Sequence, residues 1–327
     1  KQEPAYGADV LRLWVSSVDY SADVPIGAGI LRQLADVYRK VRNTSRYLLG
    51  NLHDFDPASD AIPVADLPLL DRWMLQRSAE VMDEITAAFE SFEFFRFFQL
   101  LQNFCVTDLS NFYLDIAKDR LYVSAPADRR RRSCQTVMAL IIERLAGLIA
   151  PVLCHMAEDI WQNLPYPVEE NSVFLRGWPD VPHAWRDLSV VEPVQQLREL
   201  RTAVNRVLED CRSRQELGAS LEAAVRIEAR SPGLQSALSW LDRQGDVHVD
   251  GLRDWLLVSQ LQLGGEPWAE LLASQDDPIA LIEVSRARGT KCERCWHYEG
   301  DVGRHPEHPH LCGRCVEVLE RRTHQLA

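Results

Sequence analysis

The chain has no run of about 20 apolar residues, the length that a helix needs to cross the hydrocarbon core of a bilayer. It also opens without the basic-then-apolar leader of a secreted protein. We therefore expect neither membrane insertion nor secretion. Lysine is scarce too, because only four of the 36 basic residues are lysine and the rest are arginine. Arginine favours planar, bidentate phosphate contacts, although a GC-rich genome would produce the same bias.

Charge is unevenly distributed along the chain. The net charge of −12 argues against a protein that coats nucleic acid in general. Residues 1–46 contain seven basic and five acidic residues, and residues 286–327 contain eight basic and six acidic residues. The stretch between them contains 21 basic and 37 acidic residues. Basic ends around an acidic middle fit a protein that contacts a polyanion at a few chosen places.

Four cysteines near the end of the chain have the spacing of a metal site. Cys292-x-x-Cys295 is followed after sixteen residues by Cys312-x-x-Cys315. Each pair can chelate from one tight turn, and four soft sulfurs with no open position predict one structural zinc and not a catalytic metal. Two disulfides in a small secreted module are the alternative. It is disfavoured because the remaining cysteines sit singly in apolar helical surroundings, as reduced thiols do: Cys105, Cys134, Cys154 and Cys211.

Cations and an aromatic ring are interleaved with these cysteines. Arg294, Trp296 and Arg314 are therefore candidate nucleic-acid contacts, since a base can stack on the ring and a guanidinium group can reach a phosphate or a base. A zinc-stapled cap that only closes a domain is the alternative.

Most of the chain has helical periodicity. Asp66-Leu67-Pro68 predicts a capped helix start, after which apolar residues recur at three- and four-residue steps as far as Phe92. Further helices are expected over 94–116, 133–150, 156–161 and 193–211. Together they predict an antiparallel helical bundle whose aromatic stripe belongs to the core.

The pattern changes after Gly218. Residues 225–229 and 257–261 alternate as strands do, with a helix expected around 234–241, and residues 282–284 predict a third short strand that leads into the cysteine segment. These elements predict a small α/β subdomain from about residue 221 to residue 285.

A second basic segment lies near the start of the chain. Arg39, Arg42 and Arg46 recur on one face of an expected helix, with Lys40 and Asn43 beside them. Like charges on one helix face repel each other by a few tenths of a kcal/mol per exposed pair, about 0.2–0.5. A partner anion would explain the arrangement, and a solvated face without a partner is the alternative.

Three segments of the chain, in this order, resemble the bacterial isoleucine–tRNA ligases, which are class I aminoacyl-tRNA synthetases. They are residues 38–52, residues 108–122, and the cysteine segments 289–296 and 311–315. Residues 7–12, Gly-Ala-Asp-x-Leu-Arg, are similar to the segment after the catalytic domain of the isoleucine, valine and leucine enzymes. The cysteine segments also resemble the zinc module of formamidopyrimidine-type DNA glycosylases.

The resemblance implies a mainly α fold in four parts. These are a stem-contact helical junction over 1–56, an anticodon-binding helix bundle over 57–218, a small α/β junction subdomain over 219–288 and a zinc-binding tRNA-contact module over 289–327. The chain would be the tRNA-recognition half of an enzyme that attaches isoleucine to its tRNA using ATP. Its partners would be isoleucine tRNA and the catalytic and editing domains, and we expect a monomer. The tRNA contacts would include Arg39, Lys40, Arg42, Asn43 and Arg46, and the run Arg129-Arg130-Arg131-Arg132, expected between two helices, is either a further RNA contact or a solvated loop.

Catalytic signatures are missing. The family's His-Ile-Gly-His and Lys-Met-Ser-Lys-Ser motifs and its large editing insertion are absent, as are a Ser/His/Asp set, a glycine-rich phosphate loop and a carboxylate pair. We therefore expect a piece of a longer chain with no catalytic residue of its own, and ATP and magnesium use by the full-length enzyme only. A free-standing RNA-binding module derived from a synthetase is the alternative. A DNA-repair enzyme is disfavoured because a helical bundle has no place in the glycosylase family.

Overall fold

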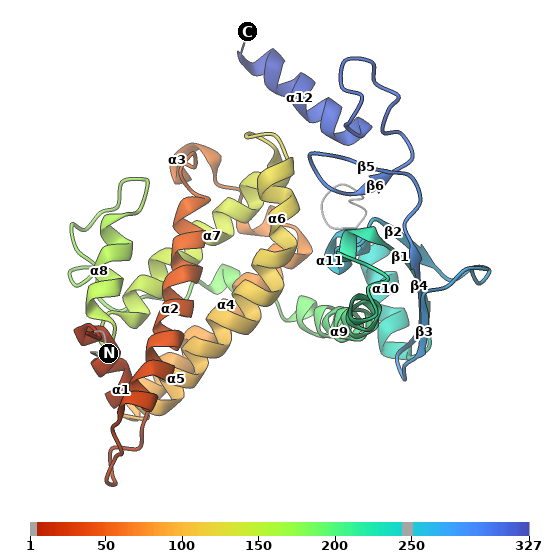
Figure 1. Ribbon diagram of the computed structural model, residues 1–327. Coiled ribbons are helices and arrows are strands. Elements are labelled where there is room, and N and C mark those ends of the chain that lie inside the picture. The colour runs from red at the N-terminus through yellow and green to blue at the C-terminus, as the bar shows by residue number, and fades with distance from the viewer. Residues whose placement is uncertain (1–4, 244–250, 327) are drawn as a thin grey trace. The chain divides into compact units, whose positions relative to one another are not determined.

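The computed structural model describes residues 5–243 and 251–326, which form two compact units interleaved along the chain (Figure 1). The first unit comprises Lys1–Leu67, Asp71–Asp115 and Arg132–Asp187, and the second comprises Pro68–Leu70, Ile116–Arg131 and Leu188–Ala327. The four-part division implied by the resemblance stays a prediction.

Helices build the first unit. In chain order, those that lie in it wholly or for most of their length are α1 (Ala8–Ser16), α2 (Ala28–Gly50), α3 (Pro57–Asp60), α4 (Leu69–Glu90), α5 (Phe94–Asn103), α7 (Arg129–Ile149) and α8 (Cys154–Gln162). The long helix α2 packs against α1, α5 and α8. Its buried face combines apolar side chains with two small hydroxyl side chains, which leaves its basic residues on the outer face: Leu34, Val41, Thr44, Ser45 and Leu48 are buried. The prediction of a mainly α fold is confirmed.

The helix predicted over 94–116 is not regular. Between α5 and α6 (Leu114–Val123) the chain is π-helical over Phe104–Tyr113. This stretch buries two polar side chains against α4: the Tyr113 hydroxyl donates to Asp71 (2.6 Å) and the Arg77 guanidinium donates to Asp108 (3.0 Å). A π-helical turn shifts the phase of a helix, and apolar spacing alone cannot reveal such a shift.

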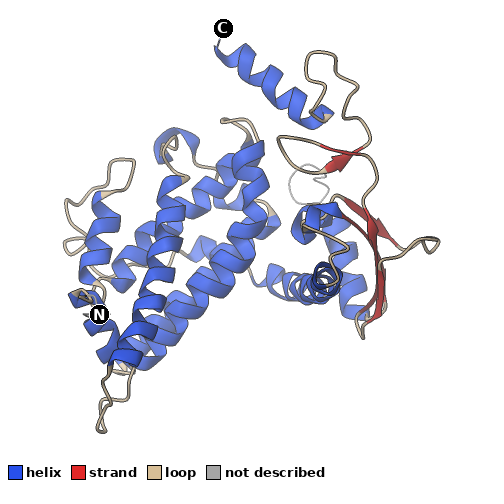
Figure 2. Cartoon of the chain, in the orientation of Figure 1, coloured by secondary structure: helices blue, strands red, loops and turns tan. Residues whose placement is uncertain are grey.

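A four-stranded sheet organises the second unit (Figure 2), and its strand order is β2-β1-β4-β3. The strands are β1 (Ala223–Ala229), β2 (Gln260–Leu263), β3 (Ala273–Asp276) and β4 (Ala280–Arg286). β1 and β2 are parallel, with α10 (Pro232–Arg243) and α11 (Leu252–Leu256) between them in sequence, and β4 is antiparallel to both β1 and β3. The predicted β-α-β arrangement is confirmed.

Two predictions about this unit need correction, and one of its strands was not predicted. The helix expected in the bundle, α9 (Val191–Ser213), packs instead against α10, α11, β3 and β4. Its apolar periodicity predicts a buried face but not the element that covers it. The second strand starts at Gln260, because Leu257 takes a left-handed φ of +55° and ends α11. Strand β3 was not expected, since Ala273–Asp276 lacks apolar alternation.

The chain ends with two short strands and a helix. The two-stranded pair β5 (Thr290–Lys291) and β6 (Tyr298–Glu299) precedes α12 (Gly313–Leu326). Within residues 5–243 and 251–326, no helix combines the length and the apolar character needed to span a membrane.

Candidate metal centre and nucleic-acid interface

The first cysteine pair lies in the tight turn that joins β5 to β6. Within this turn the Cys292 N–H donates to the His297 carbonyl, and the Trp296 N–H donates to the Cys292 carbonyl, both at 2.9 Å. Closing the turn places Trp296 at a left-handed φ of +66°, a region that costs an L side chain about 1–2 kcal/mol. The turn aims the sulfurs of Cys292 and Cys295 inward, where both residues are buried.

The second cysteine pair lies where α12 begins. The Cys312 N–H donates to the Cys292 sulfur (3.4 Å), and the Gly313 N–H donates to an Asp301 carboxylate oxygen (2.8 Å). A Cβ atom on Gly313 would lie 2.8 Å from that oxygen, so glycine permits the close approach. Cys315 follows in the first turn of α12.

The four sulfur atoms converge on one buried point. All of them lie within 4.8 Å of one another, and the Cys295 and Cys312 sulfurs are 3.7 Å apart. A tetrahedral zinc with Zn–S bonds of ~2.3 Å separates its sulfurs by ~3.8 Å, which matches. Hydrogen bonding with the Cys312 and Cys315 thiols lowers the pKa of Cys295, so the cluster favours a thiolate. The cluster therefore fits one structural zinc.

The cluster is covered by apolar side chains. Val123 at the end of α6 is buried against it, and Val302 and Leu311 pack around it. This cover leaves no open coordination position for a substrate, in keeping with a structural and not a catalytic metal.

A buried carboxylate on α6 holds the start of α12. Asp119 accepts two hydrogen bonds from Arg314, at 2.8 and 2.9 Å, and one from Arg130 at 2.7 Å. Arg130 in turn contacts Asp254. Burial alone would raise the pKa of Asp119, but the two guanidinium groups lower it. The carboxylate also raises the pKa of Arg314 despite the burial of that side chain.

Among the predicted contacts in this segment, Trp296 is the one that faces outward. Its side chain is 60% exposed, and the Lys291 amine lies 5.7 Å from the ring centroid. Arg294 is half-buried and contacts the Cys315 sulfur (3.6 Å) and the Tyr122 carbonyl (3.5 Å). Arg314 is held by Asp119, so its guanidinium group is turned into the protein.

The outer face of α2 carries the other predicted contacts. Arg39, Lys40, Arg42, Asn43 and Arg46 are all exposed there. The structure thus brings the five residues together on one exposed helical surface. Among the residues that the structure describes, one carboxylate pairs with this surface: Asp36 lies 2.9 Å from Arg39, and both side chains remain more than half exposed.

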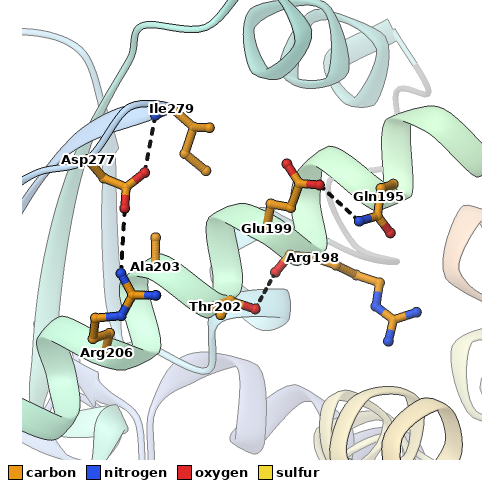
Figure 3. Close-up of a pocket in the computed structure, with 8 residues that line it drawn as sticks. All are labelled: Gln195, Arg198, Glu199, Thr202, Ala203, Arg206, Asp277 and Ile279. Atoms are coloured by element: carbon orange, nitrogen blue, oxygen red, sulfur yellow. Dashed lines mark hydrogen bonds and ion pairs between the residues drawn. The ribbon is translucent and has the colours of Figure 1, made fainter.

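A pocket also lies on α9 beside the turn between β3 and β4 (Figure 3). Its lining is mixed in charge, because Arg206 faces Asp277 at 3.8 Å and Gln195 donates to Glu199 at 2.9 Å. Such a lining differs from the basic surface of α2 and gives no reason to expect a nucleic acid there.

Known families match two parts of the chain. Residues 71–227 match the anticodon-binding domain of tRNA ligases, and residues 289–318 match the zinc finger found in FPG and IleRS. An isoleucine–tRNA ligase from Parasynechococcus marenigrum (strain WH8102) is 86% identical over 326 residues, which cover 100% of this chain and 34% of that protein. Over its whole length, the chain is similar to isoleucine–tRNA ligases. Relatives of the same name from Prochlorococcus marinus strains MIT 9313 and MIT 9515 are 80% and 54% identical, each over 98% of this chain and 33% of their own length.

The chain spans about a third of the length of these isoleucine–tRNA ligases. It carries the anticodon-binding domain and the zinc finger, so the resemblance inferred from the motifs is confirmed, and so is the fit to one structural zinc. The individual RNA contacts stay predictions.

The arginine run at residues 129–132 has a structural role that its sequence did not indicate. Arg129 begins α7, so the run is helical and not a loop between helices. Arg130 and Arg131 are buried, and the Arg131 guanidinium donates to the carbonyls of Leu121 and Pro126. Arg132 donates to the Asp54 carbonyl (2.8 Å) and pairs with Asp60 (3.3 Å). These contacts argue against the predicted RNA contact by the buried members of the run.

Two residues of the metal centre were missed. Asp119 stands in the family-like segment 108–122, but nothing in its spacing marks it as the partner of Arg314. His297 is buried beside Cys295, and burial lowers its pKa; its Nδ1 has no hydrogen-bond partner among the described residues. Only its place two residues after a ligand could have drawn attention to it.

Proposed function

We propose that this chain forms the tRNA-recognition part of an isoleucine–tRNA ligase, which attaches isoleucine to its tRNA using ATP. The observation that carries the proposal is the 86% identity, over the whole chain, to a protein of that name. The match of residues 71–227 to an anticodon-binding domain supports it independently. The rest of the polypeptide would supply the catalytic and editing parts, which use ATP and magnesium, and the protein would act in the cytoplasm as a monomer.

Within this part, Cys292, Cys295, Cys312 and Cys315 would hold the zinc. The metal would supply no chemistry to the reaction; it would fix the loop that presents Trp296. The exposed ring offers a flat apolar surface on which a base can stack. Arg314 would position the metal centre through its hydrogen bonds with Asp119. Arg294 is half-buried, so part of its side chain would be available to RNA.

The outer face of α2 would contact tRNA phosphates. Arg39, Lys40, Arg42 and Arg46 carry four positive charges on one exposed surface, with Asn43 as a further hydrogen-bond donor. Contacts of this kind strengthen binding without reading the base sequence.

Binding to tRNAs that differ only in the anticodon tests recognition directly. We expect the 327-residue chain to bind isoleucine tRNA more tightly than the same tRNA with the anticodon of methionine tRNA, because anticodon recognition resides in this part. Fluorescence anisotropy with labelled tRNAs measures both affinities. Equal affinities for the two molecules would refute recognition of the anticodon.

Catalysis provides a second test. Because the two ATP-handling signatures are absent, the chain alone should show no isoleucine-dependent exchange of pyrophosphate with ATP. Exchange above a heat-inactivated control would contradict the proposal. The gene distinguishes the free-standing RNA-binding module: an upstream open frame encoding Lys-Met-Ser-Lys-Ser excludes it, and a start codon and ribosome site immediately before Lys1 support it.

A further inference from the structure

A second group of metal-ligating side chains lies in the first unit, where α1 meets the start of α8 (Figure 1). The group consists of Asp9 on α1 and of Cys154 and His155, the first two residues of α8. Nothing in the proposed tRNA recognition uses it.

Hydrogen bonds from Arg12 hold α1 against the start of α8 and so place Asp9 there. Arg12, one turn further along α1, donates to the carbonyls of Val152 (2.8 Å) and Pro151 (2.7 Å), the residues that lead into α8. Asp9 then receives the N–H groups of His155 (3.3 Å) and Met156 (2.9 Å) and caps the helix from outside. Its carboxylate is 3% exposed, so its position is fixed before any ligand binds.

One oxygen of this carboxylate is contacted by two side chains as well. Asp9 Oδ1 lies 3.0 Å from His155 Nδ1 and 3.6 Å from the Cys154 sulfur, and the sulfur lies 3.4 Å from the same ring nitrogen. Asp9 Oδ1 already accepts the backbone N–H of His155. One lone pair is therefore left for two donors, the Cys154 thiol and the His155 ring nitrogen. A single cation in place of those two protons would satisfy all three atoms.

We infer that Asp9, Cys154 and His155 form a second divalent-metal site, separate from the four-cysteine cluster and suited to zinc or cobalt. In a tetrahedral zinc site the sulfur–nitrogen and sulfur–oxygen separations are about 3.5 Å and the nitrogen–oxygen separation is about 3.3 Å. The three observed separations differ from these by a few tenths of an ångström. One thiolate, one imidazole and one carboxylate are ligand types that zinc accepts.

The exposure of the group fits a site with an open fourth position. The His155 side chain is 73% exposed and Cys154 is half-buried, so water can complete the coordination and metal can enter from solvent. The positive end of α8 opposes a cation and lowers the affinity of the site. On binding, Cys154 loses its proton to solvent, and His155 binds through Nδ1 as the neutral imidazole that carries its proton on Nε2. The site is therefore weaker than the buried cluster and exchanges with free metal.

Cobalt titration tests this site in the full 327-residue chain. The protein is first prepared with zinc in the four-cysteine cluster, and Co²⁺ is then added while thiolate-to-cobalt absorption and released zinc are measured. We expect a further equivalent of cobalt to bind, with absorption from one thiolate and with the zinc retained. Cys154→Ser and His155→Gln should each weaken this binding about tenfold or more, since outer-shell changes already cost about 10–100-fold.

The variants separate metal binding from helix capping. Serine keeps a hydroxyl donor for Asp9, so Cys154→Ser should melt like the parent protein. His53→Gln changes another exposed histidine of the first unit and should leave cobalt binding unchanged. The site is refuted if the parent binds no cobalt beyond the cluster, if the added cobalt shows no thiolate absorption, or if Cys154→Ser binds it as tightly as the parent does.

Discussion

Arg314 and Asp119 are joined by two hydrogen bonds, at 2.8 and 2.9 Å, although 195 residues separate them in sequence. The pair connects α6 to the first turn of α12. This turn contains Cys315 and follows directly after Cys312. Because the Asp119 side chain is only 11% exposed, the guanidinium group has replaced water as its partner. The arginine beside the cysteines thus positions the metal centre and is not turned outward towards a ligand.

Replacing Asp119 with asparagine should therefore destabilise the second unit. The change leaves the guanidinium group of Arg314 without its counter-charge and leaves Arg130 with Asp254 alone, and breaking a buried pair costs about 3 kcal/mol. Urea unfolding of the parent and the variant measures the difference in unfolding free energy. Glu317→Gln on the exposed face of α12 removes the same charge and should change stability by less than ~0.5 kcal/mol. If both variants behave alike, the Asp119 network does not hold the centre.

The zinc site leads to a second prediction. The purified chain should contain about one zinc, and Cys295→Ser should release it and unfold the last ~40 residues, because a module this small depends on its metal for folding. Elemental analysis gives the zinc content, and limited proteolysis reports the unfolding. Cys105→Ser, at a buried cysteine of the first unit, is the control and should retain zinc. Full zinc retention in a Cys295→Ser, Cys312→Ser double variant would contradict the assignment.

The features that could be predicted from the sequence are those that depend on local spacing. The Cys-x-x-Cys pairs, the helical periodicity of α4 and the exposed basic face of α2 each lie within one short segment. Their geometry follows from the turn or helix itself. The same reasoning found β1 and β4 through their alternation.

The features that could not be predicted depend on partners distant in sequence. Asp119 meets Arg314, Asp9 meets the start of α8, and α9 meets the sheet, and no spacing within a segment specifies such pairs. The arginine run at 129–132 shows the same difficulty. Four adjacent cations suggest a solvated or RNA-binding loop, but buried carboxylates and carbonyls elsewhere in the chain receive most of them.

The basic face of α2 leads to a prediction about salt. Changing Arg39, Arg42 and Arg46 together to glutamine should weaken binding of isoleucine tRNA, because contacts with phosphates are lost. The loss should be similar for other tRNAs, and the plot of log affinity against log salt concentration should become shallower by up to about two to three units. Anisotropy titrations at several salt concentrations measure both effects.

A charge-matched control separates a contact from a change in net charge. Arg198, Arg206 and Arg214 lie on α9 or at its end, and changing these three to glutamine removes the same total charge from the protein. This control variant should keep the salt slope of the parent. Unchanged affinity and slope in the α2 variant would show that its basic face is only a solvated surface.

Trp296 combines an exposed ring with a left-handed backbone, and two substitutions separate these properties. Trp296→Ala removes the ring but keeps an L side chain at φ +66°, whereas Trp296→Gly removes the ring and relieves the strain. We expect the glycine variant to be more stable than the alanine variant by ~1 kcal/mol, with zinc bound in both. If a base stacks on the ring, both variants should lose ~1–3 kcal/mol of tRNA binding, selectively for isoleucine tRNA. An equal loss for every RNA would mean that the ring only packs on the zinc loop, and recognition would then reside in the anticodon-binding domain.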